Sequence, residues 1–135
     1  MAGIDETRPF TPITIAVLTV SDTRTENDDK SGTLLSNMLV DAGHNLAESS
    51  IVKDDIPAIQ AQINKWVDDK SIDAIITTGG TGFTGRDVTP DAVKPLFDKE
   101  IDGFSALFHQ LSYEKIGTST IQSRACGGLI KDTFV

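Results

Sequence analysis

The order of apolar and polar segments predicts a chain in which β-strands alternate with α-helices. Residues 13–20 (ITIAVLTV) are β-branched and almost continuously apolar, which is typical of a central parallel strand covered on both faces. A weaker strand is expected at residues 46–52 and a short strand at residues 72–78. This alternation indicates a single α/β domain: a mostly parallel sheet with right-handed crossovers and helices on both faces.

The segments between and after these strands carry helix signals. Ser31 is expected to cap one helix, and Gly43 to end it. Asp54 or Asp55 is expected to cap the next helix, whose apolar stripe is Ile59, Ile63, Trp66 and Val67. Another helix begins near Pro90, and no clear strand precedes Glu100.

A last amphipathic helix is marked by Phe104, Leu107, Phe108 and Leu111. We expect this stripe to join the core of the chain, and a face between subunits is the alternative. The chain ends with Thr133–Val135, which look like the start of one more strand.

Three loops leave the predicted strands at their carboxyl ends, where open α/β sheets bind ligands. They begin at residues 21–22, residues 53–55 and the glycine-rich stretch TTGGTGFTGRDVTPDA at residues 77–92. Glycine permits positive φ angles and close approach of a ligand, and successive loop amides can form an anion site. The stretch therefore predicts a pocket for a phosphorylated ligand, with a long idle turn as the alternative.

Two better-known phosphate motifs do not fit this stretch. Residues 80–85 match G-x-G-x-x-G, but a dinucleotide site needs a helix directly after it, and here residues 86–89 delay the helix. The Walker pattern also fails, because no Gly-Lys-Ser/Thr is present.

Composition limits the classes of function. The 135 residues, 39% of them apolar, suffice for one domain, and the net charge of -8 argues against nucleic acid and anionic membranes as partners. The single Cys126 suits a reducing compartment, and the first residues contain no signal-peptide core, so a cytoplasmic protein is expected.

The motifs TGGTG at residues 78–82 and RDVTPD at residues 86–91 resemble the signature of the MogA/MoaB family of molybdenum cofactor biosynthesis proteins, which includes the G domain of gephyrin. The resemblance extends over residues 12–135, through Ser21, DKSG at residues 29–32, IVKDD at residues 51–55 and SRA at residues 123–125. Residues 1–11 are interpreted as an N-terminal extension.

The resemblance implies a three-layer α/β/α domain that binds molybdopterin, and active family members adenylylate the pterin phosphate with ATP and Mg²⁺. It places the family's two important acidic positions on Asp54 and Asp87, as catalytic and metal-binding residues. It implies that the ligands are bound by Ser21, Thr78, Gly79, Gly80, Thr81, Gly82, Arg86, Ser119, Ser123 and Arg124.

Each of these assignments has a purely structural alternative. Asp54 could serve as a helix cap, and Asp87 could bond the backbone of its own turn. Ser123 and Arg124 could lie at a solvated helix end. The chemistry favours the functional interpretation, because joining two polyanions requires a hard cation and fixed positive groups.

The resemblance also implies a homotrimer or a hexamer, and a separate protein that inserts molybdenum or tungsten. The family continues beyond Val135 with a strand, a Pro-Gly-Ser-type loop and a helix, so we expect a truncated chain or a tail that is missing from this sequence. The rival hypothesis is a module that binds pterin, or only assembles, without catalysis.

Overall fold

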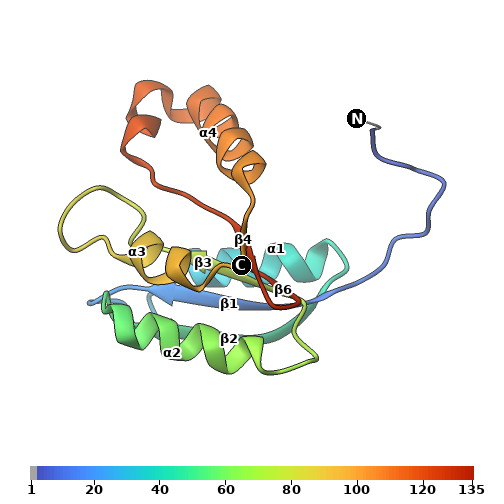
Figure 1. Cartoon of the computed structure of the whole chain (residues 1–135), viewed down its shortest axis with the longest axis horizontal. Coiled ribbons are helices and arrows are strands. Elements are labelled where there is room, and N and C mark those ends of the chain that lie inside the picture. The colour runs from blue at the N-terminus through green and yellow to red at the C-terminus, as the bar shows by residue number, and fades with distance from the viewer. Residues whose placement is uncertain (1–2) are drawn as a thin grey trace.

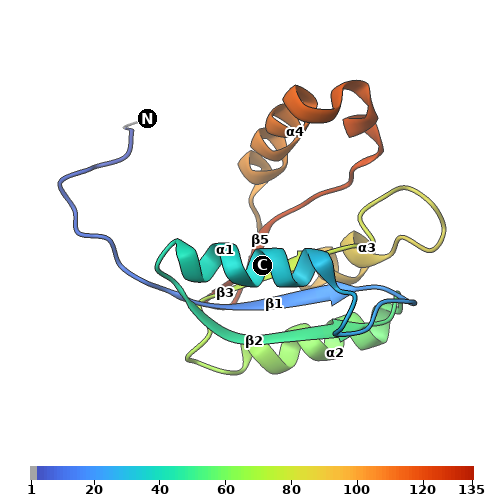
Figure 2. The same cartoon turned by 180° about the vertical axis from the view of Figure 1, so that it is seen from behind.

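The computed structural model describes residues 3–135 as a six-stranded sheet flanked by helices (Figures 1 and 2). The strands are β1 (Thr14–Val20), β2 (Asn45–Val52), β3 (Ala74–Thr78), β4 (Lys99–Glu100), β5 (Gly128–Ile130) and β6 (Thr133–Phe134). The helices are α1 (Lys30–Asp41), α2 (Ile56–Val67), α3 (Thr89–Val93) and α4 (Asp102–Ile116), with the short 3-10 helices η1 (Lys94–Leu96) and η2 (Gly117–Gln122). The predicted single-domain α/β fold is confirmed.

The sheet order β2-β1-β3-β6-β5-β4 places the most apolar strand between two parallel neighbours. β6 also runs parallel to β3, whereas β4 and β5 add two antiparallel pairs. The sheet is therefore mostly parallel, as predicted. The sequence expectation of no strand before Glu100 is wrong, because the two-residue β4 ends there and pairs with β5.

Two apolar layers enclose β1. On one face, Leu18 packs with Ile59, Ile63 and Trp66 of α2 and with Ala92 and Val93 of α3. On the other face, Ile15 and Val17 pack with Leu39 of α1. Figure 2 shows α1 and α2 on opposite sides of the strands. The continuous apolar run of β1 is explained by this burial on both faces.

The caps of the first two helices decide which acidic groups remain available. Asp29, and not Ser31 as expected, caps α1: its carboxylate accepts from the Gly32 amide at 3.0 Å and from the Thr19 hydroxyl at 2.7 Å. Asp55 caps α2 by accepting from the Ala58 amide at 2.9 Å. Asp54 is therefore not the cap of this helix.

α4 differs from the other long helices because none of its residues is buried. Its apolar stripe remains open, with Phe104, Leu107, Phe108 and Leu111 between 42% and 56% exposed. The expectation that this stripe joins the core of the chain is therefore wrong. α4 stands away from the sheet in Figure 1, and an apolar cavity of about 550 Å³ lies between Phe104, Phe108 and β3.

None of the helices in residues 3–135 has the length and apolar character that a membrane span requires.

Candidate functional site

The carboxyl ends of β2, β1 and β3 meet at one edge of the sheet, because these strands are neighbours. From β1 the chain continues through α1 to β2 on one side, and then through α2 to β3 on the other. Such a reversal of strand order opens a crevice between the two central strands. The residues gathered at this edge include Ser21, Asp54, Thr78, Gly79, Gly80, Thr81, Gly82, Arg86 and Asp87.

The glycine loop, which we define as residues 79–88, begins with two residues of positive φ: 97° at Gly79 and 66° at Gly80. A Cβ atom on Gly79 would collide with the Val20 carbonyl, so this glycine lets the loop cross over the end of β1. Thr89 then secures the loop start, because its hydroxyl donates to the Gly79 carbonyl at 2.8 Å. The loop is thus held against both central strands.

Both predicted acidic residues lie directly against glycines of this loop. A Cβ atom on Gly80 would lie 3.0 Å from Asp54 Oδ1, and one on Gly82 would lie 2.6 Å from Asp87 Oδ2. The glycine-rich motif predicts the close approach of a phosphate at these glycines. In the structure they also make room for the chain's own carboxylates, which the motif alone did not reveal.

Asp54 is half-buried at the end of β2, beside residues of two other loops. Its backbone amide donates to Asp22 Oδ1 at 3.0 Å. Desolvation and the neighbouring charges of Asp22 and Asp87 raise the pKa of the Asp54 carboxyl, and the attraction of Arg86 opposes this rise. A carboxylate in these surroundings gains from a cation that enters the crevice.

Asp87 is held by its own turn, as the structural alternative expected. Its Oδ2 atom accepts from the Thr84 hydroxyl at 2.6 Å and from the Thr84 amide at 3.1 Å. These bonds, and the hydroxyl bond above all, lower the pKa of Asp87 and keep the group ionised. A turn-forming role and a ligand-binding role are compatible here, because Thr84 bonds only one of the two carboxylate oxygens.

Asp22 also lies at this edge, although the sequence motifs do not predict it as a site residue. It accepts from the Asp54 amide through Oδ1, and its Oδ2 lies 3.7 Å from the Arg86 guanidinium. Asp22 is the second residue after β1, just as Asp54 is the second residue after β2, and this shared position is the signal that could have found it. Arg86 is 69% exposed and reaches from the glycine loop toward the end of β1.

The three residues predicted from the later part of the chain differ in position. Arg124 binds the glycine loop through its side chain, and its backbone amide donates to the Thr81 carbonyl at 2.8 Å. Ser123 lies beside it, and its carbonyl lies 2.9 Å from His109 Nε2 of α4. Ser119 is exposed on η2, and within residues 3–135 no side-chain hydrogen bond joins it to the glycine loop.

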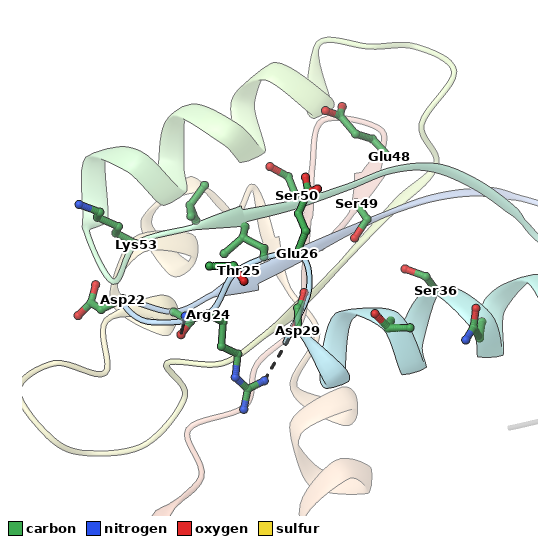
Figure 3. Close-up of a pocket in the computed structure, with 15 residues that line it drawn as sticks. Asp22, Arg24, Thr25, Glu26, Asp29, Ser36, Glu48, Ser49, Ser50 and Lys53 are labelled. Carbon is green, nitrogen blue, oxygen red and sulfur yellow. Dashed lines mark hydrogen bonds and ion pairs between the residues drawn. The ribbon is translucent and has the colours of Figure 1, made fainter.

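A polar groove of about 760 Å³ begins at the same edge and runs between α1 and β2 (Figure 3). Ser21, Asp22 and Lys53 line its near end, and Figure 3 shows the side chains of Asp22 and Lys53 where the strands end. Farther along, Arg24 pairs with Asp29 at 3.9 Å. The groove continues the crevice, but it does not contain Asp54 or Asp87, so we place the candidate chemistry at the glycine loop.

The acidic groups of the crevice fit a magnesium ion whose remaining ligands come from a substrate and from water. Among residues 3–135 no group of three or more His, Cys, Asp and Glu side chains could hold a metal ion alone. Mg²⁺ commonly binds through one or two carboxylates and completes its octahedron with phosphate oxygens and water. Asp54 and Asp87 supply such a pair, and desolvation, together with the charges of Asp22 and Asp87, raises the pKa of Asp54.

Comparison with known proteins decides the family. Residues 16–134 match the family described as "Probable molybdopterin binding domain". The molybdenum cofactor biosynthesis protein B of Escherichia coli K12 is 45% identical over 126 residues, which cover 93% of this chain and 74% of that protein. The chain belongs to the MogA/MoaB family. The Bacillus subtilis protein B is 48% identical over 120 residues, covering 88% of this chain and 71% of that protein.

Solved structures of MoaB proteins have the same fold. A crystal structure of molybdenum cofactor biosynthesis protein B superimposes with a TM-score of 0.90 at 45% identity, covering 95% of this chain and 80% of that one. The tungsten cofactor synthesizing protein MoaB from Pyrococcus furiosus gives a TM-score of 0.82 at 35% identity, with 94% and 80% covered. The family resemblance read from the loop motifs is therefore confirmed, and with it a role in molybdenum cofactor biosynthesis.

Proposed function

We propose that this MogA/MoaB protein binds molybdopterin at the glycine loop and adenylylates its terminal phosphate with Mg-ATP. The observation that carries the proposal is the position of Asp54 and Asp87, each against a different glycine of one loop. Family membership and the intact RDVTPD motif at residues 86–91 support it.

In this reaction an oxygen of the pterin phosphate forms a bond to the α-phosphorus of ATP, and the bond to pyrophosphate breaks. The pterin phosphate is already ionised, so no general base is needed. What the protein must supply is alignment of two polyanions and compensation of their charge.

The residues of the crevice divide these tasks. The amides of the glycine loop, with Thr78 and Ser21 at the strand ends, are assigned to the phosphate groups. Arg86 adds positive charge from the exposed side of the loop. Asp54 and Asp87 would hold Mg²⁺, which when bound supplies charge neutralisation to the phosphates. Ser119 and Ser123 stay assigned to the pterin side of the pocket.

We also propose that the protein assembles as a homotrimer or hexamer through α4. This 15-residue helix buries none of its residues, and Leu107 and Leu111 are 56% and 51% exposed. An exposed row of apolar side chains on one helix is typical of an interaction surface. We further propose a cytoplasmic location, which the single Cys126 suggests. The next partner would be a separate protein that inserts the metal.

The test is pyrophosphate release from Mg-ATP in the presence of molybdopterin, with Asp87→Asn and Asp54→Asn compared with the unmutated full-length protein. Each variant should lose on the order of 10²-fold in turnover, as expected for loss of a preorganised charged contact. Asp41→Asn is a matched control, because Asp41 is an exposed residue at the end of α1. Full activity in Asp87→Asn would contradict its assignment.

A non-catalytic pterin-binding module is the second candidate. The hydrogen bonds from Thr84 to Asp87 favour this candidate. They give Asp87 a structural role in its turn that requires no metal ion. Pterin binding without any pyrophosphate release from the unmutated, full-length protein would support this candidate over the enzyme.

A further inference from the structure

Arg124 is far from the glycine loop in the sequence, yet its guanidinium group is bound to that loop. Nε donates to the Gly82 carbonyl at 2.7 Å, and Nη2 donates to the Asp87 carbonyl at 2.5 Å. These two acceptors lie on either side of the loop tip, which contains Thr84. One planar side chain therefore spans the segment that carries the Asp87 carboxylate.

The same guanidinium group forms a two-pronged ion pair with Asp91 in the first turn of α3. Nη1 and Nη2 lie 3.1 Å and 3.0 Å from the two carboxylate oxygens. The pair lowers the pKa of Asp91 and raises that of Arg124, so both groups are charged. Asp91 thus fixes the orientation of the fork that Arg124 presents to the loop.

The backbone around Arg124 is itself secured. Its amide donates to the Thr81 carbonyl at 2.8 Å, which adds a main-chain contact to the loop. The preceding carbonyl, of Ser123, lies 2.9 Å from Nε2 of His109 on α4. Arg124 therefore acts from a fixed point between α4 and the loop.

These contacts leave little of the guanidinium free for a ligand. An arginine has five N–H donors, and here Nε, Nη1 and Nη2 make four hydrogen bonds within the chain. The side chain is 36% exposed, so the group is accessible but already engaged. The family resemblance implies that Arg124 binds the ligands, but these contacts favour a different role.

We propose that Arg124 is a positioning residue: it fixes the glycine loop between Gly82 and Asp87, and so holds the Asp87 carboxylate and the loop amides in the geometry that binds the phosphorylated ligands. This inference rests on the proposed function for its catalytic consequence. Its structural part, the dependence of the loop on the guanidinium fork, stands without any ligand.

The experiment compares Arg124→Ala and Arg124→Lys with the full-length protein, and uses Lys131→Ala as the control. Lys131 also forms an ion pair, with Asp68 at 3.2 Å, but both side chains are 70% exposed and lie outside the glycine loop, in the turn between β5 and β6 and at the end of α2. Amide hydrogen exchange of Thr84, Asp87 and Thr89 is measured by NMR in the ligand-free protein, because these amides donate to Asp87, Thr84 and Gly80. Pyrophosphate release from Mg-ATP and molybdopterin is measured on the same samples.

Arg124→Ala should accelerate exchange of these amides about tenfold, the factor expected for loss of a hydrogen bond to a charged group. Arg124→Lys should behave in the same way, because a point charge cannot span two carbonyls as a planar fork does. Added guanidinium ion should restore slow exchange, and turnover, to the alanine variant only. Lys131→Ala should match the unmutated protein.

Unchanged loop exchange in a folded Arg124→Ala variant would overturn the proposal. If turnover or pterin affinity still fell in that variant, Arg124 would be a direct ligand contact. Should the unmutated protein release no pyrophosphate at all, the proposed enzyme would fail, whereas the exchange result would still decide whether Arg124 positions the loop. Arg124→Lys with normal exchange would likewise contradict the fork.

Discussion

The loop after β2 and the loop after β3 each bring one aspartate to the same edge of the sheet, yet the pKa values of the two carboxyl groups are shifted in opposite directions. Asp54, after β2, is half-buried, and desolvation with like charges nearby raises its pKa. Asp87, after β3, accepts two hydrogen bonds from Thr84, which lower its pKa. The residue type is the same, and the surroundings make the difference.

This difference indicates a division of labour within the crevice. A carboxylate that is bonded by its own turn stays ionised and in one orientation, which suits a fixed ligand for a cation. A carboxylate that is destabilised in its ionised form responds to the arrival of a cation, because the cation offsets the desolvation and the repulsion that raise its pKa. Asp87 is therefore the fixed member of the pair, and Asp54 is the member that depends on its partners.

Gly82→Ala should displace the Asp87 carboxylate and have the largest effect on turnover. The new Cβ atom would lie 2.6 Å from Asp87 Oδ2, so the carboxylate would have to shift, and its bonds to Thr84 would be distorted. We expect turnover to fall by about 10²-fold, the effect of misplacing a catalytic group. Gly85→Ala is the matched control, because a Cβ atom there meets nothing within 4 Å. Equal activity of the two variants would contradict the role of Gly82 in placing Asp87.

Thr84→Val should loosen the same carboxylate without a collision. It removes the hydroxyl that donates to Asp87 Oδ2 at 2.6 Å, and leaves in place the hydrogen bond from the backbone amide of residue 84. Loss of one hydrogen bond to a charged group predicts a fall in turnover of about tenfold. Thr84→Ser keeps the hydroxyl and should retain most of the activity. A serine variant as poor as the valine variant would show that the hydroxyl is not the cause.

The pH dependence of turnover should report the ionisation of Asp54, the second aspartate of the pair. Asp54 must be ionised to bind a cation, and its pKa is raised, so activity should decline on the acid side at a higher pH than an ordinary aspartate would cause. Asp22→Asn removes a like charge and frees Arg86 from its ion pair, and both changes lower the pKa of Asp54. The acid limb should therefore move to lower pH in this variant, and an unmoved limb would exclude Asp54 as its origin.

Much of the fold was predictable from the sequence because burial and strand pattern coincide. Residues 13–20 are continuously apolar, and in the structure β1 has helices on both faces. The stripe of Ile59, Ile63, Trp66 and Val67 is buried, as its helical spacing predicts. The stripe of α4 has similar chemistry but remains exposed, since spacing shows that a helix has an apolar face and does not show what covers it.

The candidate site was predictable as a place but not as a set of contacts. Strand-loop alternation and the glycine-rich stretch located the loop, and the family resemblance selected both aspartates. The choice of Asp55 as the α2 cap, which leaves Asp54 free of that role, depends on one residue of register that propensity cannot resolve. The four bonds of Arg124 join residues more than thirty positions apart, and such long-range pairing leaves no local signal.

The smallest expected effect is on stability, and it separates the two aspartates by sign. Because the folded-state pKa of Asp54 is raised, its ionised form is a cost to the native state at neutral pH, and this cost is relieved as pH falls through that pKa. Asp54→Asn should therefore stabilise the protein at neutral pH, by about 0.5 kcal/mol or less once solvent screening of a partly exposed group is allowed for. Asp87 has a lowered pKa, so it contributes stability above its unfolded pKa, and Asp87→Asn should lower the unfolding midpoint at neutral pH. Thermal unfolding of the two variants at neutral and at acidic pH measures both signs. The difference in unfolding midpoint between the two variants should shrink in acid, where the unmutated carboxylates take up protons. A stabilised Asp87→Asn variant, or a destabilised Asp54→Asn variant, would contradict the opposite pKa shifts of the two aspartates.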